Sequence, residues 1–119
     1  MAHLLFTPLT PAIITTASNN ALSLALSATT IVYLTSTNTT TTIISLVGTD
    51  GNADGMVVCF SNINATSLSF SFSHESVTET TATKRFRNAG STGITVAQYG
   101  AVWYRWSSVA QRWQSLARV

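Results

Sequence analysis

Residues 67–76, which read SLSFSFSHES, alternate apolar and hydroxyl side chains. Leu68, Phe70 and Phe72 fall at every second position, and this is the period of a β-strand with one apolar face. A strand of this kind packs its aromatic face against a second layer of structure. The Arg-Phe-Arg segment at 85–87 restores the alternation, with its ring expected to point inward. The sequence therefore predicts a core of β-sheets around these two segments.

A Ser/Thr-rich loop, residues 77–83, separates the two segments. Glu75 precedes this loop and Arg85 follows it. Because the two ends of a loop between strands lie close together, we expect Glu75 and Arg85 to form a structural ion pair across its neck. His74 is expected to be a hydrogen-bonding neighbour of this pair.

Charged residues are scarce and unevenly distributed. They make up 8% of the 119 residues, about a third of the usual share, whereas 45% are apolar. All ten Asp, Glu, Lys and Arg residues lie between Asp50 and Arg118, so residues 1–49 carry no charge. Because charge is depleted at the centre of subunit contacts, we interpret the uncharged segment as part of such a contact. For a single small domain, this predicts a homotrimer.

Several other classes of protein fit the sequence less well. Residues 21–34 are interrupted by Ser and Thr and fall short of the roughly 18 apolar residues of a membrane span. Residues 1–10 lack the basic region of a signal peptide. The formal net charge of +2 includes one basic cluster, residues 84–87, without a nucleic-acid-binding motif. We therefore expect neither a membrane nor a nucleic-acid partner.

Short segments with strand periodicity recur along the whole chain, separated by turns. Pro8 and Pro11 indicate an extended start, because proline cannot donate to a β-ladder. This spacing is typical of an all-β sandwich or barrel. We predict a single antiparallel β-sandwich of the jelly-roll type at residues 21–119, preceded by an extended N-terminal arm at residues 1–20. The expected strands are residues 12–16, 21–26, 30–35, 42–47 (ended by Gly48), 56–60, 68–72, 85–87, 92–98 and a hairpin of 102–106 with 112–116.

Two segments have the residue types of a metal or catalytic site. Residues 50–55, DGNADG, match the first half of a calcium loop, but Ser61 stands where that loop needs a bidentate Glu. A turn explains the same letters, so we expect no metal, although weak calcium binding stays open. His74, Glu75 and Ser76 have the residue types of a hydrolase triad, but neighbouring residues on a strand point to opposite faces. We therefore expect no catalytic residues, no cofactor and no enzymatic activity.

The hairpin at 102–116 is rich in aromatic residues. Trp103, Tyr104, Trp106 and Trp113 could form a platform that stacks on sugars, or they could fill the core. Exposed rings would favour glycan binding, and buried rings would favour a purely structural role. Cys59 lies in an apolar strand and is expected to be a small buried side chain; with one cysteine, no intramolecular disulfide forms.

Residues 43–116 resemble a module of bacteriophage virion proteins. The matching pieces include His74-Glu75-Ser76, the Ser/Thr-rich loop, Arg85-Phe86, Val102-Trp103-Tyr104 and Arg112-Trp113. Two residues depart from the pattern, because Lys84 replaces an Asn before Arg-Phe and Arg105 replaces the start of a Tyr-Asp turn. Modules of this kind occur in tail fibres, head fibres and capsid-decoration proteins.

The resemblance implies a structural protein of a phage virion. Since fibres usually carry such a module on a longer chain, we expect a cement or decoration protein that binds the major capsid protein on the outer surface of the head. The alternative is a fibre or tail-tip module that binds a host glycan. For the first function, the candidate capsid-docking residues are the apolar side chains of the predicted arm: Leu4, Leu5, Phe6, Leu9, Ile13 and Ile14. The competing interpretation is that these residues form an extra strand of the sandwich itself.

Overall fold

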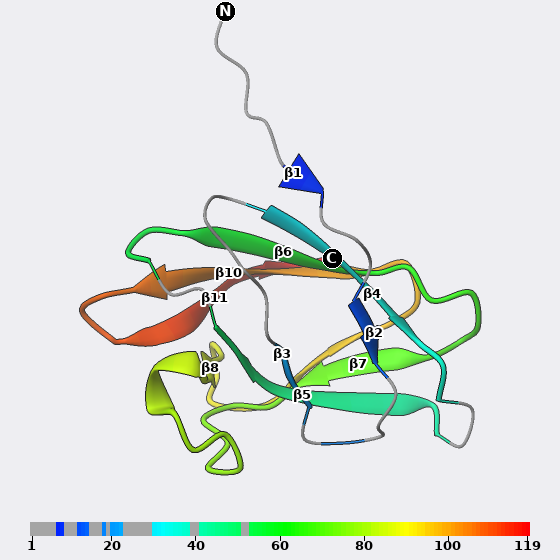
Figure 1. Cartoon of the computed structure of the whole chain (residues 1–119), viewed down its shortest axis with the longest axis horizontal. Helices are drawn as coiled ribbons and strands as arrows, with labels where there is room; N and C mark the ends of the chain where they lie inside the picture. The colour runs from blue at the N-terminus through cyan, green and yellow to red at the C-terminus, as the bar shows by residue number, and fades with distance from the viewer. Residues whose placement is uncertain are drawn as a thin grey trace, which may run out of the picture.

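The structure is a computed structural model that describes residues 7–8, 12–14, 18, 20–22, 30–38, 41–50 and 53–119. The described part is all-β, apart from one turn of 3-10 helix (Figure 1). This confirms the predicted class. The elements are β1 (Thr7–Pro8), β2 (Ala12–Ile14), β3 (Asn20–Leu22), β4 (Thr30–Ser36), β5 (Ile43–Thr49), β6 (Val57–Asn62), β7 (Ser69–Phe72), η1 (Ala82–Lys84), β8 (Phe86–Arg87), β9 (Ile94–Val96), β10 (Ala101–Ser107) and β11 (Arg112–Arg118).

The strands form two sheets. The large sheet has the order β1-β4-β6-β10-β11-β8, with β2 also paired to β4, and the small sheet has the order β3-β5-β7-β9. From β2 to β7 the chain changes sheet at every step, so each strand pairs in parallel with the strand two positions earlier. A parallel pair needs a long crossover connection, and here the intervening strand in the opposite sheet provides it. The chain therefore winds in the manner of a short β-solenoid (Figure 1).

This winding corrects the predicted antiparallel pairing. Among the described strands, only β6 with β10, β10 with β11, and β7 with β9 are antiparallel. The predicted jelly-roll order is not confirmed. The hairpin of β10 and β11 is confirmed, with a register shift between Trp103 and Tyr104. The alternation of side chains could not reveal the direction of pairing, because it is the same in parallel and antiparallel strands.

The core lies between the two sheets. Leu68, Phe70, Phe72 and Phe86 are all buried in it, as the alternation predicted. An aromatic cluster forms its centre, with ring centroids 4.7 to 6.1 Å apart in tilted and edge-on pairs. Such pairs contribute beyond the area that they bury. The cluster consists of Phe60, Phe72, Phe86 and Tyr104.

The sequence predicted that Gly48 ends its strand, but Gly48 lies inside β5. A β-carbon at this position would come within 2.5 Å of the carbonyl oxygen of Lys84. Gly48 also forms an antiparallel bridge with Arg85. The glycine is therefore needed for the close approach of η1 to β5, rather than for a turn.

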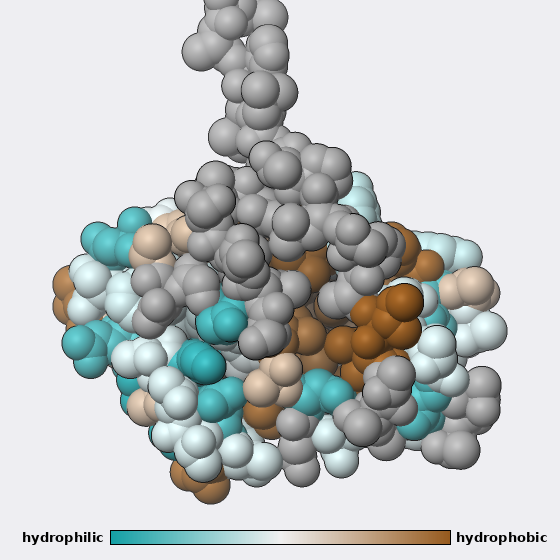
Figure 2. All heavy atoms as spheres, viewed as in Figure 1, coloured by the Kyte–Doolittle hydropathy of each residue, from teal (hydrophilic) through white to brown (hydrophobic). Residues whose placement is uncertain are grey.

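The described parts of the expected N-terminal arm pair with the body. β1 and β2 both lie parallel to β4 at the edge of the large sheet, the kind of position in which a strand tolerates Pro8. Ile14 is buried in the core, whereas Ile13 is 60% exposed. Figure 2 shows hydrophobic residues on the face where Figure 1 places β2. The expected boundary at residue 20 therefore does not separate residues 12–14 from the body, and the predicted docking role of Ile14 is wrong.

The other four predicted docking residues, Leu4, Leu5, Phe6 and Leu9, lie outside the described residues. Within the described part of the chain, no helix is long and apolar enough to span a membrane.

Candidate functional site

Glu75 is the centre of the ion pairs at the start of the loop. Its Oε1 accepts a hydrogen bond from Arg112 Nε at 2.6 Å, and its Oε2 accepts one from Arg87 at 2.9 Å. Burial raises the pKa of Glu75, but the hydrogen bonds and positive charges of Arg87 and Arg112 outweigh it and hold the pKa below its ordinary value. The carboxylate therefore ties together β8, β11 and the segment after β7.

The predicted pair of Glu75 with Arg85 is wrong. Arg85 Nε donates instead to the backbone oxygen of Glu79 at 2.9 Å. The reason is the direction of pairing: His74 and Phe86 form a parallel bridge, and this places the next residue, Glu75, level with Arg87. An antiparallel bridge between the same residues would have placed Glu75 opposite Arg85.

His74 belongs to a hydrogen-bond network centred on Asn88, next to the aromatic cluster, rather than to a triad. Its Nδ1 accepts a hydrogen bond from the backbone N–H of Asn88 at 2.9 Å. The Asn88 amide donates to the backbone oxygens of Phe72 and Thr92, and its Oδ1 accepts from the Tyr104 hydroxyl at 2.6 Å. Burial raises the pKa of Tyr104, so its hydroxyl stays protonated as a donor. His74 thus has a structural partner, as expected, although the partner is Asn88.

Asn88 was not predicted from the sequence. The only signal was Tyr104, because a tyrosine on a buried face needs a partner for its hydroxyl. That partner lies 16 residues away in the chain, and no local pattern identifies it.

The aromatic rings of the hairpin do not form an exposed platform. Tyr104 and Trp113 are wholly buried, Trp106 is 8% exposed, and Trp103 is half-buried. The indole nitrogens of Trp106 and Trp113 donate to the backbone oxygens of Thr83 and Thr49. Tyr104, Trp106 and Trp113 thus fill the core, the Trp106 bond holds η1, and the Trp113 bond joins the two sheets. This is the structural role that the sequence left open.

The two other candidates have structural surroundings as well. Asp54 Oδ1 accepts a hydrogen bond from the Ser108 backbone at 2.8 Å, and this bond lowers the pKa of Asp54. Within the described residues, which omit Gly51 and Asn52, no group of three His, Cys, Asp or Glu could hold a metal ion. Cys59 is buried, as predicted, and burial raises the pKa of its thiol.

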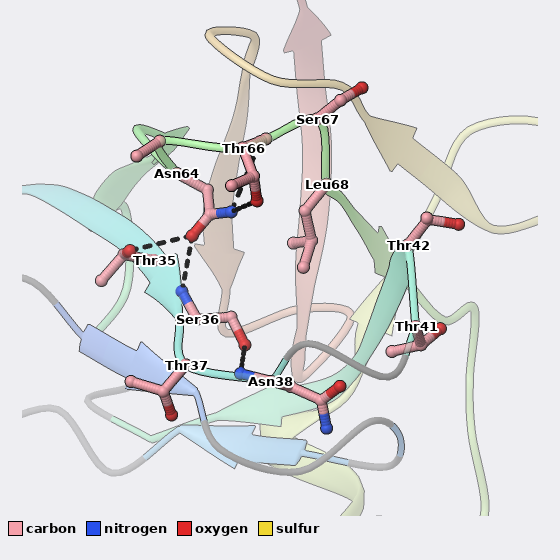
Figure 3. Close-up of a pocket in the computed structure, with 11 residues that line it drawn as sticks. Thr35, Ser36, Thr37, Asn38, Thr41, Thr42, Asn64, Thr66, Ser67 and Leu68 are labelled. Carbon is pink, nitrogen blue, oxygen red and sulfur yellow. Dashed lines mark hydrogen bonds between the residues drawn. The ribbon is translucent and has the colours of Figure 1, made fainter.

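A neutral cleft of about 450 Å³ lies where β4 and β6 end (Figure 3). Asn64 holds one wall together: its Oδ1 accepts from Thr35 Oγ1 and the Ser36 N–H, and its Nδ2 donates to Thr66. Figure 3 shows Leu68 pointing toward the middle of the cleft. The lining carries hydroxyl, amide and apolar groups without charge: Thr35, Ser36, Thr37, Asn38, Thr41, Thr42, Asn64, Ala65, Thr66, Ser67 and Leu68.

A second, basic groove of about 300 Å³ lies on the outer face of the large sheet. The ladder places Arg105 of β10 beside Gln114 of β11, and Gln114 beside Arg87 of β8. The three side chains therefore form one row across neighbouring strands. Asn88, Ala89, Ser115 and Leu116 complete the lining.

Among the described residues of β4, β6 and β10, Arg105 is the only charged one. In β4, β6 and β10 the alternate residues, such as Val32, Phe60 and Tyr104, are buried in the core, so their neighbours point outward. The register places Ile31 beside Cys59 and Cys59 beside Trp103. We call this surface the neutral face and define it by its partly or largely exposed apolar residues: Ile13, Ile31, Tyr33, Ile63 and Trp103.

In comparisons with known proteins, no protein-family model, no curated protein and no solved structure matches the chain.

Proposed function

We propose that this protein is a structural component of a bacteriophage virion, namely a cement or decoration protein on the outer surface of the head. It binds the major capsid protein and acts as a homotrimer. It has no enzymatic role and needs no cofactor. The observation that carries this proposal is the neutral face, where partly or largely exposed apolar side chains of neighbouring strands lie together without a charged residue among them.

The chemistry of this face suits a lasting contact between proteins. Apolar area that leaves water stabilises a contact by about 25 cal/mol per Å². Ile13 and Ile63 are 60% and 40% exposed in the single chain, so a partner subunit could remove much of their surface from water. No charge has to be desolvated with them, and desolvation is what makes charged contact centres unfavourable. We therefore assign the neutral face to the contacts between subunits.

The interior supports a structural role rather than a catalytic one. His74, Glu75 and Tyr104 are each held in hydrogen bonds that join strands. The aromatic rings of the β10–β11 hairpin are buried or half-buried. Because exposed rings are needed to stack on sugars, this burial favours a structural role over glycan binding. A body fixed in this way suits a protein that reinforces a shell.

The trimer is tested by light scattering with matched charge variants. Wild-type protein at micromolar concentration should have about three times the 12.7 kDa of one chain. Tyr33→Lys places a charge on the neutral face and should yield monomers. Thr95→Lys places the same charge on the exposed side of β9 and should leave the trimer intact. Equal behaviour of the two variants would refute the assignment of the neutral face.

The virion role is tested with heads of the parent phage assembled without this protein. The purified chain should sediment with these heads and appear in their density map at regular positions on the outer surface. If it binds tail fibres or cells of the host instead, the head assignment fails.

The fibre or tail-tip alternative has one observation in its favour, the neutral cleft. Its hydroxyl and amide groups, with Leu68 at the centre, suit an uncharged sugar better than an ion. Titration with neutral oligosaccharides, followed by NMR at the Asn64 and Thr66 amides, tests this function directly. Shifts that saturate there would favour a glycan-binding module.

A further inference from the structure

The basic groove has a surplus of positive charge. Three arginines, Arg87, Arg105 and Arg112, lie in or beside it, and the nearby carboxylates are Glu75 and Asp54. Glu75 pairs with Arg87 and Arg112, and Asp54 accepts a hydrogen bond from the Ser108 backbone and lies close enough to Arg105 for their charges to interact. Three positive charges thus face two negative ones, so one positive charge remains uncompensated among these groups.

The donors that face the groove are only partly used. The Arg105 side chain is exposed and makes no hydrogen bond or ion pair with any residue that the structure describes. The side chain of Arg87 is 42% exposed and gives one nitrogen to Glu75, although a guanidinium carries five N–H donors. Asn88 and Ser115 are already engaged, by Tyr104 and by the Ala89 N–H respectively. The groove thus offers guanidinium groups to an acceptor from outside.

The spacing of these groups favours an extended partner. Arg105 and Arg87 lie on β10 and β8 with β11 between them, so their backbones are two strand spacings apart, or about 10 Å. Gln114, in the middle of the row, can donate or accept. Guanidinium groups bind carboxylates in pairs of parallel hydrogen bonds. Two carboxylates on neighbouring side chains of a peptide match this row better than one small ion does.

We propose that Arg87, Gln114 and Arg105 bind the carboxylates of an acidic polypeptide segment on the partner protein. This inference rests on the proposed function in one respect, that the partner is a protein surface. It divides the large sheet into a neutral face for subunit contacts and a basic groove that faces the shell. The groove then fixes orientation, because the acidic segment of the shell can pair only with this end of the sheet.

The direct test uses NMR titration of the full chain with three probes: a glutamate oligomer, a galacturonate oligomer and inorganic phosphate. The glutamate oligomer should shift the Gln114 and Ser115 amides, and binding should weaken as salt is added. Arg105→Ala should weaken this binding about tenfold, the loss expected for a charge-assisted hydrogen bond. Arg118→Ala removes an exposed arginine of β11, the neighbouring strand, that does not line the groove, and should change the affinity little.

Each other outcome overturns the inference. If only galacturonate or phosphate binds, the groove is not a polypeptide site; if nothing binds, or if Arg118→Ala weakens binding as much as Arg105→Ala, it is not a site at all. Binding to heads separates this result from the proposed function. When wild-type protein and Arg105→Ala decorate heads equally well, the groove inference fails and the proposed function stands. When wild-type protein itself does not bind heads, the proposed function fails whatever the glutamate oligomer does.

Discussion

The strands before Asp50 and the strands after it build the same two sheets, but different interactions hold them. The described strands β1 to β5 carry no charge and are joined mainly by parallel ladders and by apolar side chains such as Ile14 and Leu46. The later strands add a hairpin, the Glu75 ion pairs and the hydrogen-bond network of Asn88. Among the described residues, the side-chain hydrogen bonds between wholly buried groups all have their donors after Asp50.

This difference bears on how each part specifies its structure. A buried polar group is satisfied in one arrangement and costs about 1–3 kcal/mol when it loses its partner. Apolar strands have less strict requirements, because a core accepts several hydrophobic side chains of similar size. We therefore expect the C-terminal part to be the rigid part of the fold, and the N-terminal strands to depend on it for their order.

The largest expected effect is that of the same substitution made in each part. Asn88→Ala removes the partner of the buried Tyr104 hydroxyl and the bonds to the Phe72 and Thr92 oxygens, so it should lower the free energy of unfolding by about 3 kcal/mol. Asn20→Ala removes a bond to the Ser45 oxygen, which is only partly buried and can bind water, and should cost about 1 kcal/mol. Urea denaturation measures both. Similar costs would remove the contrast between the two parts.

The next effect tests where the body begins. Ile14→Ala opens a space in the core and should cost about 2 kcal/mol, whereas Ile13→Ala trims an exposed side chain and should change the stability of the single chain little. Thermal melts at concentrations low enough to keep the chain monomeric separate the two. If Ile14→Ala also melts like the wild type, β2 is not part of the core and the arm predicted from the sequence regains support.

A smaller effect tests the corrected ion pair. In a double-mutant cycle, Glu75→Gln and Arg112→Ala should show a coupling of about 1 kcal/mol, because the pair is only partly exposed. The cycle of Glu75→Gln with Arg85→Ala is the matched control and should show almost none, since Arg85 bonds to the Glu79 backbone. A coupling found only with Arg85 would restore the pairing predicted from the sequence.

The smallest effect is the pH dependence of the same carboxylate. The pKa of Glu75 is lower in the folded chain than its ordinary value of 4.5. Its contribution is therefore fully present above that value and is lost as the pH falls through the lower folded pKa. Glu75→Gln should flatten this part of the acid denaturation curve. An unchanged slope would show that Glu75 gains nothing from the two arginines.

Local patterns in the sequence determined the all-β class, the inward faces of residues 68–72 and 85–87, and the β10–β11 hairpin. Each of these depends on alternation or on turns, which involve residues close together in the chain. Buried aromatic rings at Phe70 and Phe86 follow from the same period. The absence of charge before Asp50 is likewise a fact of composition, and with it the neutral character of the first strands.

The tertiary structure decided which strands pair and in which direction. Alternation is the same in parallel and antiparallel sheets, so no local pattern predicted the winding from β2 to β7 or the parallel direction of the His74–Phe86 bridge. The parallel bridge places Glu75 level with Arg87 instead of Arg85, and the pairing of β8 with β11 brings Arg112 to the same carboxylate from 37 residues away. The ladders of β11 with β10 and with β8 align Arg105, Gln114 and Arg87 in one row. A row across three strands exists only once their order and register are set, because its members are neighbours in space and not in sequence.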